Sequence, residues 1–111
     1  MEIRADHFSS EAEALTEIEA AGHWPVTVEF APEKNEDHWH DFDSMLFVLE
    51  GELRVTEADT GETCVCRAGT RLIAKAGVLH REEHDGYKAV IGLSVDPATL
   101  TQPINKPPRS D

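Results

Sequence analysis

Histidines that could bind a metal lie in two short stretches of the 111-residue chain. His38 and His40 are separated only by Trp39. A β-strand would place both imidazoles on one face, because side chains alternate along a strand. His80 lies in the second stretch and could complete a site with them if two strands meet. Since imidazole is the commonest neutral protein ligand of divalent transition metals, the spacing predicts metal chemistry in a small β fold.

Whole-chain properties restrict the kind of protein that can hold such a site. A chain of 111 residues has room for one domain with a modest core. Its formal net charge of -12 argues against nucleic acid and anionic membranes as partners, since both attract clustered Lys and Arg. No apolar run approaches the roughly 20 residues of a membrane span, and the first residues lack the apolar segment of a signal peptide. We therefore expect a cytoplasmic protein.

The residue pattern predicts one helix followed by several short strands. Ser10 and Glu13 form a capping-box pattern, and apolar residues follow at helical spacing until Gly22, so a helix is expected over about 10–21. Further along, apolar residues alternate or form short runs separated by glycine turns, which favours a β-sandwich or barrel. The expected strands cover 26–30, 44–49, 53–57, 63–67, 71–74, 78–83 and 88–95, with a turn at Glu50-Gly51.

The chain ends in a proline-rich stretch that begins after Asp96, and proline disfavours regular structure. We expect residues 1–111 to form a single domain. Its parts would be an N-terminal helical arm over 1–23, a barrel over 24–95 and an extended tail over 96–111. The tail would pack across the barrel, pack on a partner subunit or fray, and the sequence does not choose among these.

The first histidine stretch resembles the first motif of the cupin superfamily, in which His-x-His is followed by Glu and then by Gly. His38, His40 and Gly51 match this motif. Ser44 stands at the position of the Glu, which is a departure from the family pattern.

The second stretch resembles the second cupin motif. Gly69, Gly77 and His80 match it, whereas Lys75 and His84 stand where Pro and Asn are usual. The resemblance covers about residues 24–95. It implies an all-β fold: the cupin double-stranded β-helix, or jelly-roll barrel, with one short N-terminal helix and an extended Pro-rich C-terminal tail. It says little about activity, because this fold hosts many unrelated functions.

The resemblance implies one divalent metal ion inside the barrel, of the kind of Zn, Fe, Mn or Ni. The ligands that it implies are the motif histidines His38, His40 and His80. Ser44 is a poor substitute for a carboxylate, so a fourth ligand could be Ser44 itself, Asp43 turned inward by a bulge, or His84 on the strand face of His80. Three histidines and a water molecule would also suffice.

A nearby carboxylate would serve as a further ligand or as a general base, and Asp43 and Glu82 are the two candidates. Asp43 is otherwise a turn residue that caps its neighbours. Glu82 shares a strand face with His80 but belongs to a charged run that would otherwise be a solvated strand end. Two histidines with Asp43 would resemble a facial triad suited to Fe(II), whereas three histidines suit zinc.

Three classes of function stay open at this point. The first is a metal-binding small cupin with a small-molecule pocket, acting as an oxygenase, isomerase or lyase if it is an enzyme. The alternative is a non-catalytic binding or sensing module, and the third is a structural or storage barrel. Few basic residues would lie inside, with Lys75 and Arg81 as the nearby cations. Small cupins often pair, so we expect a homodimer, and we expect Cys64 and Cys66 to be inert apolar side chains.

Overall fold

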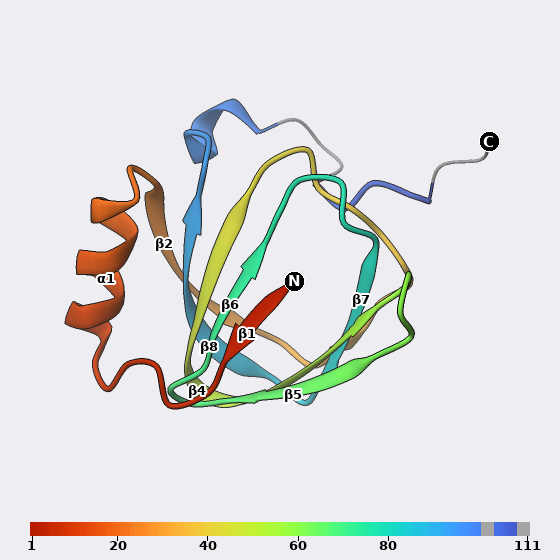
Figure 1. Cartoon of the computed structure of the whole chain (residues 1–111), viewed down its shortest axis with the longest axis horizontal. Helices are drawn as coiled ribbons and strands as arrows, with labels where there is room; N and C mark the ends of the chain where they lie inside the picture. The colour runs from red at the N-terminus through yellow and green to blue at the C-terminus, as the bar shows by residue number, and fades with distance from the viewer. Residues whose placement is uncertain (101–103, 109–111) are drawn as a thin grey trace.

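The protein's structure is a computed structural model, and it describes residues 1–100 and 104–108. Strands dominate these residues, with one α-helix near the N-terminus and a single 3-10 turn near the C-terminus (Figure 1). In chain order the elements are β1 (Glu2–Arg4), α1 (Glu11–Ala20), β2 (Trp24–Phe30), β3 (Glu33–Lys34), β4 (Ser44–Glu57), β5 (Thr63–Arg67), β6 (Arg71–Ala74), β7 (His80–His84), β8 (Tyr87–Leu93) and η1 (Pro97–Thr99).

The strands form two antiparallel sheets that share the long strand β4. In the first sheet the order is β1-β6-β4-β8-β2, and the first half of β4 pairs with β6 and β8. In the second sheet the order is β5-β4-β7-β3, and the second half of β4 pairs with β5 and β7. The two sheets curve around a common interior (Figure 1). The predicted all-β jelly-roll fold with one short helix is therefore confirmed.

Strand β4 runs through Glu50 and Gly51, where the sequence predicts a turn. The strand is continuous there, and a register shift between Val48 and Glu50 bends it from one sheet into the other. Before the bend Leu46 faces the interior, and after it Leu53 does. The residues that face inward have even numbers before the bend and odd numbers after it, as expected when a bulge inserts one extra residue. Gly51 has φ of 86°, a backbone conformation that favours glycine, so the glycine marks the bend.

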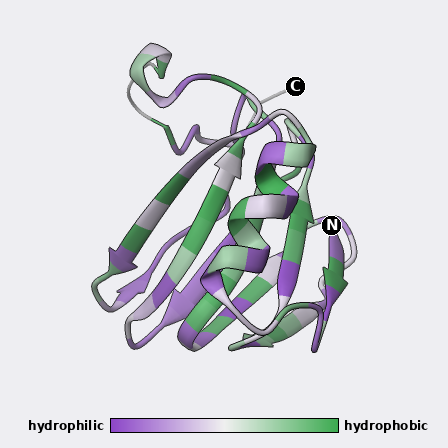
Figure 2. Cartoon of the chain, turned by 90° about the vertical axis from the view of Figure 1, so that its left-hand side faces the viewer, coloured by the Kyte–Doolittle hydropathy of each residue, from purple (hydrophilic) through white to green (hydrophobic). Residues whose placement is uncertain are grey.

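Helix α1 covers the outer face of the first sheet (Figure 2). Ser10 caps its first turn by accepting a hydrogen bond from the backbone N–H of Glu13 (3.2 Å), as the sequence predicts. Ile18 packs on Phe47 of β4, and both side chains are fully buried. Gly92 of β8 permits the close approach, because a Cβ atom there would lie 2.8 Å from Cγ2 of Ile18. With ten residues, α1 is too short and too polar to span a membrane, and no other helix of the described residues could do so.

Beyond β8 the proline-rich stretch contains the short helix η1, capped by the Asp96 side chain. Residues 104–108 then lie beside Trp39, and the backbones of Trp39 and Lys106 exchange two hydrogen bonds of 3.1 and 2.9 Å. The predicted tail over 96–111 is thus described in part, since 101–103 and 109–111 lie outside the described residues.

Candidate metal centre

Two adjacent segments bring the candidate ligands together. The segment that precedes β4 carries His38 and His40, and β7 carries His80 and Glu82. The backbones of His38 and His80 pair through two hydrogen bonds, 2.8 and 2.9 Å long. Because each segment contributes residues at positions i and i+2, all four side chains point to the same side of this pair. Their ligand atoms lie within 4.8 Å of one another.

Hydrogen bonds at Nδ1 fix the orientation of each of the three imidazole rings. Every Nδ1 faces a backbone carbonyl, which can only accept, so Nδ1 carries a proton and donates it. In this tautomer a neutral ring has a free lone pair on Nε2, as metal-binding histidines require. The three bonds are His38 Nδ1 to Glu36 O (2.8 Å), His80 Nδ1 to Val78 O (2.9 Å) and His40 Nδ1 to Ile104 O (3.0 Å).

The Nε2 atoms converge on the carboxylate of Glu82. Glu82 Oε1 lies 3.3 Å from His80 Nε2 and 3.7 Å from His38 Nε2. His38 Nε2 is buried and has no hydrogen-bond partner. A buried polar nitrogen without a partner is rare and calls for an explanation such as an ion that completes the site. The residues therefore fit a metal ion: three imidazole nitrogens and one carboxylate oxygen are a donor set that divalent transition metals accept.

The electrostatics of the cluster keep its carboxylate ionised. Burial alone would raise the pKa of Glu82, but the neighbouring His38 and His80 outweigh burial and hold this pKa at about 2. Burial likewise tends to lower the pKa of His38, yet Glu82 and the Glu36 carbonyl raise it above the ordinary 6.5. The pKa of His40 is lowered, chiefly by burial. A metal ion bound at the Nε2 atoms would compete with protons for the same lone pairs.

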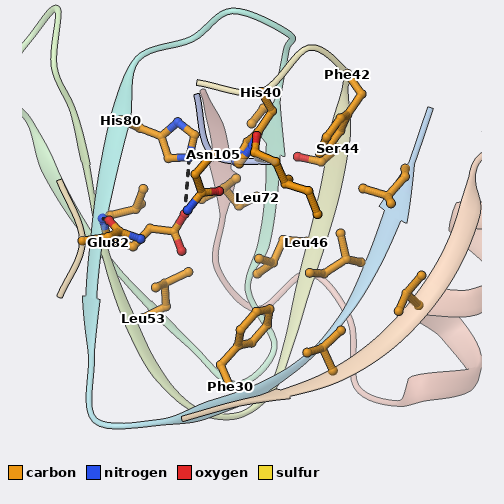
Figure 3. Close-up of a pocket in the computed structure, with 18 of the residues that line it drawn as sticks. Phe30, His40, Phe42, Ser44, Leu46, Leu53, Leu72, His80, Glu82 and Asn105 are labelled. Atoms are coloured by element: carbon orange, nitrogen blue, oxygen red, sulfur yellow. Dashed lines mark hydrogen bonds and ion pairs between the residues drawn. The ribbon is translucent and has the colours of Figure 1, made fainter. Parts of the chain in front are cut away.

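A cavity of about 580 Å³ opens beside the cluster inside the barrel. Figure 3 shows His40, His80 and Glu82 at one end and Phe30 and Leu53 toward the other. Most of the remaining wall is aliphatic. It includes Val26, Val28, Leu46, Val55, Leu72, Ile91 and Leu93. Among the described residues no Lys or Arg lines the cavity, and the two cations considered from the sequence lie elsewhere: Lys75 is exposed and Arg81 pairs with Asp37 (3.1 Å).

Comparison with known proteins supports this architecture. The chain matches the family model of the cupin domain over residues 26–96, more than half of its length. The chain belongs to the cupin family. Residues 26–96 of this cupin include all four possible ligands, His38, His40, His80 and Glu82.

Solved structures with the same fold include proteins from three bacteria. A DUF861 family protein from Thermotoga maritima superposes with a TM-score of 0.61 at 20% identity, covering 83% of this cupin and 97% of that chain. A protein from Neisseria meningitidis is 30% identical over 63% of this cupin and 72% of its own chain, with a TM-score of 0.53. A cupin-2 domain protein from Shewanella frigidimarina is 23% identical over 65% and 69%, with a TM-score of 0.55. No functionally curated protein matches the chain.

Asp43 and Ser44, two further ligand candidates from the sequence, do not join the cluster. The Asp43 carboxylate turns to the loop before β7 and accepts a hydrogen bond from the backbone N–H of Ala76 (2.8 Å). Its backbone N–H donates a hydrogen bond to the hydroxyl oxygen of Ser94 (2.9 Å). Asp43 is thus a turn residue in this cupin, because no bulge turns it inward at the start of β4. Ser44 lines the cavity with its neutral side chain.

His84 is buried at a different place along the cavity wall. Its ring packs against Tyr87 (centroids 4.6 Å apart) and Phe30 (6.2 Å), and its Nδ1 accepts a hydrogen bond from Gly86 N–H (3.1 Å). Four residues along a strand span roughly 13 Å, so a shared face with His80 does not bring the two rings to one ion. Glu82, only two residues from His80, is within reach, and this spacing was the signal in the sequence that separates Glu82 from His84.

The two cysteines lie on the inner side of β5 and are both free thiols. Cys66 is fully buried, and burial raises the pKa of its thiol to about 11. A protonated thiol is a poor nucleophile and a poor metal ligand. The burial of Cys66 agrees with the expectation of an inert packing side chain, whereas Cys64 is partly exposed.

Proposed function

We propose that this cupin holds one divalent metal ion with His38, His40, His80 and Glu82 and binds a small molecule in the adjoining cavity. The single observation that carries the proposal is the buried Nε2 of His38, which makes no hydrogen bond and lies with the carboxylate and imidazoles of the other three residues in one cluster. When bound, such an ion supplies Lewis acidity toward an oxygen-bearing ligand or, with iron or manganese, redox chemistry.

Glu82 acts in this proposal as a ligand rather than as a general base. With a pKa of about 2 it carries a full negative charge near neutral pH and is a weak proton acceptor. Its charge offsets part of the charge of a divalent ion in a site that is otherwise built from neutral imidazoles. Tyr87 and His84 are the other titratable side chains deep in the cavity wall, and burial raises the pKa of Tyr87, so its phenol stays protonated.

The shape and chemistry of the cavity define the class of ligand that we propose. The ligand has one polar head, which approaches the cluster, and an apolar body, which lies against the aliphatic wall. A second charged group at the apolar end would find no described Lys or Arg in the wall, and the α-ammonium group of Met1, which also lines the cavity, already pairs with Glu57 (3.2 Å). Burying an unpaired charge is costly. Whether the ligand is turned over or only sensed separates the enzyme from the non-catalytic module. The homodimer and the cytoplasmic location stay predictions.

Elemental analysis of the protein purified without a histidine tag tests the metal site. We expect about one equivalent of Zn, Fe, Mn or Ni in the native protein and none in the His38→Ala/His80→Ala double variant. Glu82→Gln should weaken binding by 10-fold or more, at about the scale of a lost ligand, whereas the matched control Asp43→Asn should retain it. Absence of metal from the native protein, even after incubation with each ion, would contradict the proposal.

A matched pair of linear acids tests the ligand class. Octanoate and octanedioate have the same length, but only octanedioate carries a second carboxylate, which would be buried at the apolar end. We expect octanoate to raise the melting temperature of the zinc-loaded protein and octanedioate to have little effect. A larger shift with octanedioate would show that the cavity accepts charge at both ends. Turnover assays that depend on bound metal would then favour the enzyme, and ligand binding that survives metal removal would favour the sensing module.

A further inference from the structure

The three histidines of the cluster differ in where their Nδ1 partners come from. His38 and His80 each donate to a carbonyl two residues earlier in their own segment, so their rings are oriented locally. His40 instead donates to the carbonyl of Ile104 (3.0 Å), which lies 64 positions later in the chain. The orientation of one of the three imidazole rings therefore depends on a segment that lies outside both sheets.

The residues on either side of His40 hold that segment in place. Trp39 and Lys106 pair through their backbones, and the indole Nε1–H of Trp39 donates to the carbonyl of Pro107 (2.7 Å). On the other side of His40, the Asp41 carboxylate lies 3.7 Å from the ammonium group of Lys106. The short stretch 39–41 thus both docks residues 104–108 and contains the His40 ring that they orient.

We infer that residues 104–108 form a positioning segment for His40, and that docking of this segment and metal binding strengthen each other. The inference rests on the proposed metal site. When Ile104 O accepts the Nδ1 proton, the lone pair of His40 Nε2 is fixed toward the cluster. When the segment leaves, the ring can rotate, and the proton can move to Nε2, which would block the metal. Because linkage is reciprocal, an ion that requires the oriented ring must in turn favour the docked segment.

The same segment also bounds the cavity. Ile104, Asn105 and Leu100 line it, and Figure 3 shows Asn105 beside His40 and His80 at the polar end. Docking of the segment therefore closes one side of the ligand site at the same time as it orients His40. The metal-loaded protein should hold this side closed more of the time than the metal-free protein does.

Two substitutions at one position separate the backbone contact from the side chain of Lys106. Lys106→Pro removes the N–H that donates to Trp39, whereas Lys106→Ala keeps this N–H and removes the side chain that pairs with Asp41. In competition with a chelator, we expect Lys106→Pro to bind Zn²⁺ about 10-fold more weakly than the native protein, and Lys106→Ala to bind within about 2-fold of it. The visible absorption of bound Co²⁺ should change in Lys106→Pro only, because the change in ligand orientation reaches the metal.

Hydrogen exchange of the native full-length protein provides the reciprocal test and does not depend on how the variants fold. Addition of Zn²⁺ should slow exchange at the Lys106 amide by several-fold, and far-UV circular dichroism should show that both metal-free variants keep the barrel. Equal Zn²⁺ affinity in the two variants, with Lys106 exchange unaffected by Zn²⁺, would overturn the inference while leaving the metal site intact. Failure of the native protein to bind any metal would overturn both proposals.

Discussion

The two faces of the first sheet differ in how tightly they are packed. On the outer face, Ala14 and Ile18 of α1 meet Phe47 of β4, and all three side chains are completely buried. On the inner face, Val28 and Leu46 are only partly buried because they border the cavity. The outer face is thus closed beneath α1, while part of the inner face leaves apolar surface beside the cavity. The difference shows that one sheet can bury close-packed side chains on one side and border a cavity on the other.

The first and largest test of this contrast compares neighbours on β4. Phe47→Ala should lower the free energy of unfolding by about 3–5 kcal/mol, because it empties a filled site beneath α1. Leu46→Ala should cost only about 1–2 kcal/mol, because its side chain already borders a cavity. Urea unfolding of the metal-free variants measures both. Equal losses for the two variants would show that the inner face is packed as tightly as the outer one.

The second test uses pH, which should act on the cavity side alone. Metal binding requires unprotonated Nε2 atoms, and Glu82 raises the pKa of His38 above 6.5. Zn²⁺ affinity should therefore fall as pH falls, by about 10- to 100-fold between pH 7.5 and 5.5 if one proton is displaced. Glu82, with its pKa of about 2, stays ionised over this range and should not contribute.

Calorimetry in buffers of different ionisation enthalpy would count the released protons directly. In Glu82→Gln, His38 loses the neighbour that raises its pKa, so the fall in affinity should move to lower pH. An affinity that does not change between pH 7.5 and 5.5 would contradict the assignment of His38 as a ligand.

A smaller effect is expected where the helix approaches the sheet most closely. Gly92→Ala adds a Cβ atom that would lie 2.8 Å from Cγ2 and 2.9 Å from Cγ1 of Ile18. We expect a loss of about 1–3 kcal/mol from overpacking, measured by thermal or urea unfolding. In an Ile18→Ala background the added methyl group has room, so the two losses should sum to more than that of the double variant. Strict additivity would show that the helix shifts freely away from β8.

The smallest effect concerns the two cysteines of β5. Cys66 is fully buried with a pKa raised to about 11, whereas Cys64, two residues away, is partly exposed. A thiol reagent at pH 8 should modify Cys64 quickly and Cys66 only on the timescale of unfolding. Mass spectrometry of the labelled peptides measures the two rates. Rapid labelling of Cys66 would show that this part of the inner wall is as open as the cavity.

The structure also shows which features can be predicted from a sequence and which cannot. The i, i+2 spacing of His38 and His40 is local, so it predicted two imidazoles on one side without knowledge of the fold. The all-β fold was predictable from the short apolar runs and the glycine spacing. The same alternation places Glu82 beside His80. Asp43 was also a candidate from the sequence, because the side-chain direction of a residue just before a strand depends on the conformation of the preceding turn.

Two other features leave no clear mark in the sequence. A register shift in β4 reverses which residues face inward. In the sequence it is marked by Gly51, and a glycine at this position is equally typical of a turn. The partner of His40 is a backbone carbonyl, which every residue carries, so no residue type at position 104 could have predicted the contact. Non-local pairings of this kind appear only when the chain is folded.

The carboxylate of the cluster has changed strands relative to the family pattern that the chain resembles. In that pattern a Glu would stand at Ser44, at the start of β4, whereas here Glu82 on β7 lies beside His80. Both positions border the same cavity, so either can supply one negative charge to three neutral imidazoles. What the chemistry of such a site requires is therefore a count of charges around a point in space, and more than one sequence position can supply each charge.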